Sequence, residues 1–169
     1  MRSGMQARIE GLLETCRQRG LILRTAESCT AGGVAAALAS VAGASDVLDR
    51  GWITYSNRAK GEELGVAADL IAAHGAVSRA VVEAMAAGGS RGVQPDAHAV
   101  CIAISGIAGP GGGTQDKPVG TVWMAVAMPG EACISHRYQF SGDRAQIQAA
   151  SVNQAIVQLQ EALSKDSNA

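Results

Sequence analysis

The segment Thr25-Ala-Glu-Ser-Cys-Thr-Ala-Gly-Gly33 follows a short apolar run and precedes a helical pattern of small residues. This order predicts a strand that ends in a sharp turn and leads into a helix. Such a turn exposes the side chain at its apex and directs the first free amides of the helix beside it. Ser28 is therefore a candidate nucleophile, and the amides of Cys29 and Thr30 are candidate donors to an oxyanion. Taken alone, the segment favours a simpler role, in which Ser28 or Thr30 caps the helix.

Strands and helices alternate along the first half of the chain, and paired strands follow in the second half. Residues 97–105 are almost continuously apolar, which is typical of a strand covered on both faces. The pattern predicts one domain over residues 1–169, a three-layer α/β/α sandwich on a mixed, mostly parallel sheet, with a disordered tail at 164–169. Periodicity predicts helices at residues 5–19, 34–40, 57–64, 68–73, 77–91 and 143–163, and strands at 21–26, 47–55, 97–105, 119–128 and 134–140.

Composition narrows the classes of function. The net charge is -1 and no basic block is present, which argues against a nucleic-acid partner. No apolar run approaches the ~20 residues that a membrane-spanning helix needs. The 4 cysteines are scattered and the 3 histidines are isolated, so we expect neither a structural metal nor another cofactor. This cysteine usage fits a reducing cytoplasm.

The segment Tyr55-Ser-Asn-Arg-Ala-Lys60 is expected at a second junction of strand and helix. If Ser56 or Asn57 caps that helix, Lys60 falls in its first turn, where the helix dipole disfavours a charged ammonium. Partial burial disfavours the charge further, so Lys60 is a candidate general base for Ser28. The alternative is an ordinary solvated lysine.

Tyr55 allows two interpretations of equal weight. Its ring can fill the edge of the sheet, with the hydroxyl satisfied locally. Its hydroxyl can instead relay or orient a proton between Ser28 and Lys60.

The glycine-rich segment Ser105-Gly-Ile-Ala-Gly-Pro-Gly-Gly-Gly113 directly follows the predicted buried strand. Repeated glycines let the backbone approach a ligand and present amides to a phosphate or carboxylate. The segment matches neither the P-loop pattern nor GxGxxG, so a flexible connection between strands is the alternative. Near the last helix, Arg144 can bind a phosphate or carboxylate, or brace the loop through Asp143 or Glu27. Glu27 itself is expected to be ionised and bonded to the backbone amides that shape its turn.

Six segments, taken in order, resemble the CinA C-terminal domain family, which includes stand-alone bacterial nicotinamide-nucleotide amidases of the PncC type. The resemblance covers nearly the whole chain. The segments are Thr25-Ala-Glu-Ser-Cys-Thr30, Tyr55-Ser-Asn57 with Lys60, Gly75-Ala-Val-Ser78, the glycine-rich segment 105–113, Lys117-Pro-Val-Gly-Thr-Val122 and Phe140-Ser-Gly-Asp-Arg144.

The resemblance implies hydrolysis of the carboxamide of nicotinamide mononucleotide to nicotinate mononucleotide and ammonia, a step of pyridine-nucleotide salvage. It also implies a serine/lysine mechanism that needs no metal, with Ser28 as nucleophile, Lys60 as base and Tyr55 assisting. The candidate substrate-binding residues are Cys29, Thr30, Gly32, Asn57, Ser105, Gly106, Gly109, Gly111 and Arg144.

The chain departs from the family pattern at Ala31, where many members have glycine, and the added methyl group is expected to narrow the start of the helix. Full-length members carry an N-terminal molybdopterin-binding-like domain linked to a pyrophosphatase activity; these residues have no counterpart of it, so that activity is not expected. The alternative function is a non-catalytic module that binds a nucleotide or a partner, linked to competence or DNA repair. We expect a homodimer or a higher homo-oligomer, because two-fold assemblies are common.

Overall fold

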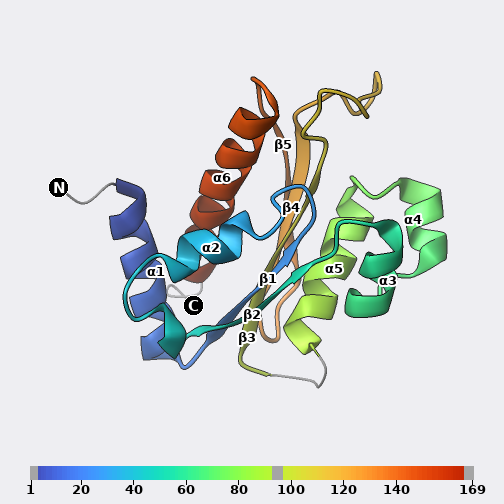
Figure 1. Cartoon of the computed structure of the whole chain (residues 1–169). Coiled ribbons are helices and arrows are strands. Elements are labelled where there is room, and N and C mark those ends of the chain that lie inside the picture. Colours follow the sequence, from blue (N-terminus) through green and yellow to red (C-terminus); the bar gives the residue numbers. More distant parts are fainter. Residues whose placement is uncertain (1–3, 93–96, 166–169) are drawn as a thin grey trace.

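In residues 4–92 and 97–165, which the computed structural model describes, five strands form one sheet in the order β2-β1-β3-β4-β5 (Figure 1). β1 pairs in parallel with β2 and β3, whereas β4 pairs antiparallel with β3 and β5. Four strands thus run in one direction and β4 in the other, which confirms the predicted mixed, mostly parallel sheet. The strands are β1 (Ile22–Glu27), β2 (Leu48–Ile53), β3 (Ala99–Gly106), β4 (Thr121–Ala127) and β5 (Ile134–Gln139).

Helices cover both faces of the sheet, so the predicted three-layer sandwich is confirmed (Figure 1). One face carries α1 (Gly4–Arg19), α2 (Gly33–Ala39) and α6 (Arg144–Lys165). The other face carries α3 (Asn57–Leu64), α4 (Ala68–His74) and α5 (Arg79–Arg91), and a short 3-10 helix, η1 (Ala44–Asp46), leads into β2.

β3 separates two apolar clusters, one on each side of the sheet. Successive side chains of a strand point to opposite faces. Val100, Ile102 and Ile104 therefore join the cluster under α1, α2 and α6, whereas Cys101 and Ala103 join the cluster under α5. All five side chains are fully buried, as expected for a strand covered on both faces.

The predicted end of the chain needs one correction. Ser164 and Lys165 continue α6 instead of beginning a disordered tail, because Ala162 and Leu163 still pack against the core and hold the last turn. Residues 166–169, the rest of the predicted tail, lie outside the described residues.

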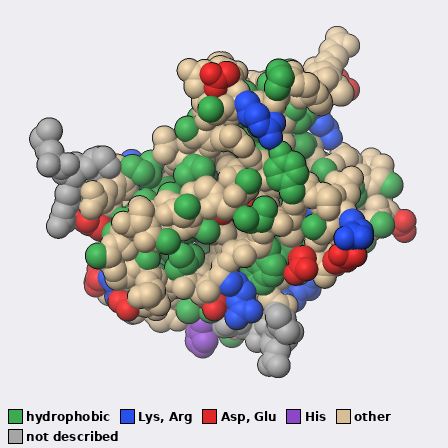
Figure 2. Space-filling view, viewed as in Figure 1, with side chains coloured by type: hydrophobic (Ala, Val, Ile, Leu, Met, Phe, Trp, Pro, Cys, Tyr) green, Lys and Arg blue, Asp and Glu red, His purple; other side chains and the backbone are tan. Residues whose placement is uncertain are grey.

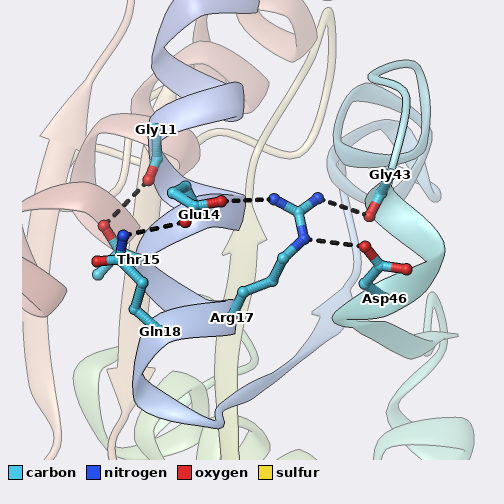
Figure 3. A network of polar contacts seen from close by, with 7 residues as sticks. All are labelled: Gly11, Glu14, Thr15, Arg17, Gln18, Gly43 and Asp46. Carbon is cyan, nitrogen blue, oxygen red and sulfur yellow. Dashed lines mark hydrogen bonds and ion pairs between the residues drawn. The ribbon is translucent and has the colours of Figure 1, made fainter.

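Arg17 fastens the end of α1 to the segment between α2 and β2 (Figure 3). Its guanidinium donates to the carboxylates of Glu14 at 3.0 Å and Asp46 at 2.9 Å, and to the carbonyl of Gly43 at 3.0 Å. Exposed ion pairs contribute little stability. The network therefore serves mainly to orient the chain where it enters β2.

The charge distribution and the cysteines give little further indication of function. On the face seen in Figure 2, Lys and Arg side chains are interspersed with Asp and Glu, without an extended patch of one sign. No helix within the two described ranges is long and apolar enough to cross a membrane. In the same part of the chain, no group of three His, Cys, Asp or Glu side chains could hold a metal ion. The four cysteines are free thiols, and only Cys133 is not fully buried.

Candidate active site

The carboxyl ends of β1, β2 and β3 lie side by side at one end of the sheet. Glu27, at the end of β1, is in register with Ile53 of β2 and Ile104 of β3. The connection from β1 to β2 runs through α2 on one face, and the connection from β2 to β3 runs through α3, α4 and α5 on the other (Figure 1). Neighbouring connections that leave to opposite faces open a crevice, in which open α/β sheets bind their ligands.

Glu27 shapes the turn between β1 and α2. Its buried carboxylate accepts a hydrogen bond from the hydroxyl of Thr30 at 2.6 Å. It also accepts from the amides of Gly32 and Val34 at 3.1 Å and of Ala35 at 2.9 Å. A carboxylate at a helix N-terminus satisfies free amides and complements the helix dipole. The predicted bonding of Glu27 to the amides of its turn is therefore confirmed.

Neither Ser28 nor Thr30 caps α2, so the simpler role suggested by this segment is wrong. The helix begins at Gly33, and the residue before it makes no side-chain cap bond. Ser28 is instead held through its backbone, because its amide donates to the carbonyl of Ile104 at 3.0 Å. Its hydroxyl therefore remains for other contacts.

Ala31 adopts a left-handed backbone with φ of 48°. This region costs a residue with a Cβ atom about 1–2 kcal/mol, and glycine avoids most of that penalty. The methyl group of Ala31 is exposed and does not narrow the start of the helix as expected. Alanine in place of glycine therefore costs backbone conformational energy and does not restrict the space at the start of α2.

Lys60 reaches Ser28 from helix α3. The hydroxyl of Ser56 caps α3 by accepting from the amide of Ala59 at 3.0 Å, and Lys60 follows one turn later. Side chains of a helix lean toward its N-terminus, which here faces the end of β1. The Nζ atom lies 3.2 Å from Oγ of Ser28. Lys60 is only 1% exposed, so it is not an ordinary solvated lysine.

The surroundings of Lys60 make its ammonium form less favourable than that of an exposed lysine. Burial lowers its pKa, because the ammonium loses its hydration. Nζ donates to the carbonyl of Thr54 at 2.9 Å and to that of Tyr55 at 3.4 Å. A neutral amine has two N–H groups and one lone pair. Two carbonyls can take the N–H groups, which leaves the lone pair to face the hydroxyl of Ser28, the arrangement of a general base.

Cys29 is next to Ser28 but is not a suitable nucleophile. Burial raises the pKa of its thiol to about 11, so the thiol stays protonated near neutral pH. Within residues 4–92 and 97–165, the backbone amide of Thr30 donates to no other group of the protein, and that of Cys29 contacts only its own thiol. They are therefore available to a ligand oxygen.

A cavity of about 270 Å³ opens beside Ser28 and Lys60. It brings together all of the predicted site residues except Thr30 and Gly32, which contact Glu27 instead. The residues that line it are Ser28, Cys29, Tyr55, Asn57, Lys60, Ala76, Val77, Ser105, Gly106, Ile107, Ala108, Gly109, Gly111, Gly112 and Arg144.

Arg144 joins the glycine-rich loop to Tyr55. Its guanidinium donates to the carbonyl of Gly109 at 2.7 Å and to the hydroxyl of Tyr55 at 2.6 Å. Arg144 thus braces the loop, but not through Asp143 or Glu27 as expected. Asp143 is engaged with Gln146 at the start of α6, and Glu27 with its own turn.

The side chain of Tyr55 lies at the mouth of the site and contacts Arg144. Its side chain is 55% exposed, so the ring does not fill the edge of the sheet. Its hydroxyl accepts from Arg144, and within the described part of the chain it makes no hydrogen bond to Ser28 or Lys60. What Tyr55 offers Lys60 is its backbone carbonyl.

Sequence reasoning missed the contribution of the segment before α5. Ala76 and Val77 line the cavity, and the hydroxyl of Ser105 donates to the carbonyl of Ala76 at 2.8 Å. Ser78 caps α5 through the amide of Val81. The segment 75–78 is one of the six with a family resemblance, but its polar side chain, Ser78, serves the helix cap and does not indicate a role in the cavity.

The chain matches the model of the CinA C-terminal domain over residues 5–163. This protein belongs to the CinA C-terminal domain family. It is 47% identical over 131 residues to the nicotinamide-nucleotide amidohydrolase PncC of Escherichia coli K12, which covers 78% of each chain. It is 44% identical over 155 residues to a CinA-like protein of Syntrophobacter fumaroxidans, covering 92% of this chain but only 36% of that relative, so it spans about a third of it.

Solved structures of this family have the same fold. The competence/damage inducible protein of Agrobacterium tumefaciens superposes with a TM-score of 0.88 at 36% identity, over 97% of this chain and 98% of that one. A CinA superfamily protein of Klebsiella pneumoniae gives a TM-score of 0.88 at 37% identity, over 96% and 99%. The resemblance and the fold class predicted from the sequence are both confirmed.

Proposed function

We propose that this single-domain chain hydrolyses the carboxamide of nicotinamide mononucleotide to nicotinate mononucleotide and ammonia. The observation that carries the proposal is the buried amine of Lys60, 3.2 Å from the hydroxyl of Ser28 at the wall of a cavity. The name of the Escherichia coli relative supports the choice of substrate.

In the first half of the reaction, Oγ of Ser28 attacks the carboxamide carbon while its proton passes to Nζ of Lys60. The amides of Cys29 and Thr30 donate to the oxyanion of the tetrahedral intermediate. When the intermediate collapses, the C–N bond breaks and Lys60 returns the proton to the leaving nitrogen. Ammonia departs, and the nicotinoyl group remains as an ester on Ser28.

In the second half, a water molecule replaces ammonia and attacks the ester carbon. Lys60, again neutral, takes a proton from the water and then returns it to Oγ of Ser28 as the ester C–O bond breaks. The product leaves as the carboxylic acid, which gives its proton to the released ammonia or to solvent, and the protonation states of Ser28 and Lys60 are restored. One amine thus acts as base and acid in turn.

The glycine-rich loop and Arg144 are proposed to hold the nucleotide. Gly109 and Gly111 line the cavity and bring the backbone close to a bound phosphate. Arg144 lies at the same wall, where its guanidinium can exchange its bond to Gly109 for a charge-assisted bond to phosphate. Asn57, at the start of α3, and Ser105, at the end of β3, are proposed to contact the base or the ribose.

The cellular role and the oligomeric state are also proposals. We infer a cytoplasmic role in pyridine-nucleotide salvage and assembly as a homodimer or higher homo-oligomer. A module that only binds nucleotides is the less favoured function, because it needs no desolvated lysine beside Ser28. The test below includes this alternative because one relative of known structure is named a competence/damage inducible protein.

The direct test follows nicotinamide mononucleotide and its products by chromatography in water enriched in ¹⁸O. We expect nicotinate mononucleotide with one solvent oxygen in its carboxylate and one equivalent of ammonia. Binding of the nucleotide without release of ammonia over hours would favour the binding module.

A further inference from the structure

We propose that Gln148 of α6 is a positioning residue that orients the amide of Thr30 toward the oxyanion formed on the substrate. The inference rests on the proposed amidase function. It concerns a side chain that does not line the cavity and that no sequence motif points to.

Gln148 makes one specific contact with the turn after β1. Its Nε2 atom donates to the carbonyl of Cys29 at 3.0 Å, across 119 positions of sequence. Gln148 is half-buried in the first turns of α6, a helix that packs against α2 on the same face of the sheet. The contact therefore ties the nucleophile turn to the longest helix of the protein.

Because a peptide unit is planar, the contact with the carbonyl of Cys29 also fixes the direction of the N–H of Thr30. The carbonyl of Cys29 and the N–H of Thr30 belong to one planar, trans peptide, so they point in opposite directions. Because Gln148 holds the carbonyl toward α6, the N–H of Thr30 points away from α6. On this proposal, that direction leads toward Ser28 and the edge of the cavity that Cys29 lines.

The neighbouring peptide is held in a different way. The carbonyl of Ser28 accepts from the amide of Ala31 at 3.0 Å, which fixes the N–H of Cys29 through a bond inside the turn itself. The two proposed oxyanion donors thus depend on separate supports. Only the peptide between Cys29 and Thr30 relies on a side chain from a remote helix.

A bond at the carbonyl also strengthens the donor on the same peptide, because hydrogen bonds in a chain polarise one another. Loss of the Gln148 amide should therefore weaken the Thr30 donor and let its peptide plane rotate. The effect falls on the transition state, in which the substrate oxygen carries charge, and hardly on the bound substrate.

The test compares Gln148→Met with Gln160→Met. Both glutamines are half-buried on α6, but Gln160 accepts from Arg8, far from the nucleophile turn. Methionine keeps the length of the side chain and removes the donor. We expect kcat for nicotinamide mononucleotide to fall by about 10-fold or more in Gln148→Met with KM little changed. Gln160→Met should keep the wild-type kcat.

Gln148→Glu sharpens the result, because it keeps the shape but sets a carboxylate oxygen against the carbonyl of Cys29. Its kcat should be lower than that of Gln148→Met. Equal kcat values for Gln148→Met and Gln160→Met, or a loss confined to KM, would overturn the positioning role.

An NMR measurement that does not depend on turnover tests this inference separately from the amidase function. The amide ¹⁵N shift of a residue responds to hydrogen bonding at the preceding carbonyl. We expect the Thr30 resonance to move in Gln148→Met and to stay in place in Gln160→Met. A wild-type protein that releases no ammonia would refute the proposed function, and an unmoved Thr30 resonance would refute the role of Gln148.

Discussion

Nζ of Lys60 lies 3.2 Å from Oγ of Ser28, although 32 positions separate the two residues in the chain. The parallel pairing of β1 with β2 accounts for the distance, since Ser28 follows β1 and α3 starts shortly after β2. A buried, uncompensated ammonium is costly, whereas a buried neutral amine beside a hydroxyl is a base. The chemistry of the site therefore depends on the protonation of one lysine.

The rate of amide hydrolysis should rise with pH and then reach a plateau. Burial lowers the pKa of Lys60, and only the neutral amine, which forms above that pKa, can accept the proton of Ser28. Lys60→Arg should be inactive at every pH, because a guanidinium remains protonated. A profile that stays flat from mildly acidic to alkaline pH would contradict the role of Lys60.

Stability should depend on pH through the same group. The pKa of Lys60 is lower in the folded chain than the ~10.4 of an unfolded lysine, so the unfolded state binds more protons between the two values. Over that window, the free energy of unfolding of the wild type should rise with pH relative to Lys60→Met. Denaturant titrations at several pH values measure this difference; no change with pH would mean that the lysine is not desolvated.

Tyr55→Phe should keep kcat within about 2-fold of the wild type, because the hydroxyl of Tyr55 is bonded to Arg144 and not to the reacting groups. A proton relay through this hydroxyl would instead predict a loss of about 100-fold or more. Arg144→Met is the comparison: loss of one charged contact to the nucleotide should raise KM about 10-fold. Steady-state kinetics of the two variants separate the roles.

Glu27→Gln should destabilise the protein by about 2–3 kcal/mol, because the buried carboxylate accepts four hydrogen bonds and the new amide group would set a donor against donors. The turn that carries Ser28 should loosen, with a parallel loss of activity. Glu62→Gln is the control, since its carboxylate is exposed and pairs weakly with Arg58. Equal stabilities in denaturant titrations would show that Glu27 does not hold the turn.

Gly88→Ala should destabilise the protein by about 3 kcal/mol. A Cβ atom at Gly88 would lie 2.0 Å from the carbonyl oxygen of Leu64, so α5 and the helix that carries Lys60 would have to separate. The matched control is Gly11→Ala in α1, where an added Cβ atom would meet nothing within 4 Å. This substitution should stabilise the protein by about 0.5–1 kcal/mol, because alanine favours a helix over glycine. Melting temperatures should shift in opposite directions.

Local pattern predicted β3 because residues 99–104 form a continuous apolar run next to a turn, whereas β2 was predicted from the β-branched and aromatic residues around Trp52. The helix carrying Lys60 was predictable from Ser56 and Asn57, and the role of Glu27 from the helix that follows it. The end of α6 was less predictable, because Ala162 and Leu163 hold its last turn through tertiary packing.

Side-chain partners across the sheet could not be read from the sequence. Nothing local indicates that Arg144 would reach Tyr55, or that Gln148 would reach Cys29, since the two residues of each pair come from elements that meet only after folding. The segment before α5 was missed for a similar reason. Ala76 contributes a backbone carbonyl, which leaves no signature in side-chain chemistry.

The central claim, that Ser28 is the nucleophile, is tested most directly by ammonia release from nicotinamide mononucleotide. Wild type, Ser28→Ala and the exposed control Ser40→Ala are compared at equal concentrations of folded protein. The account predicts release by the wild type and by Ser40→Ala, and a rate at least ~1,000-fold lower for Ser28→Ala. Ammonia release by folded Ser28→Ala at the wild-type rate would contradict it.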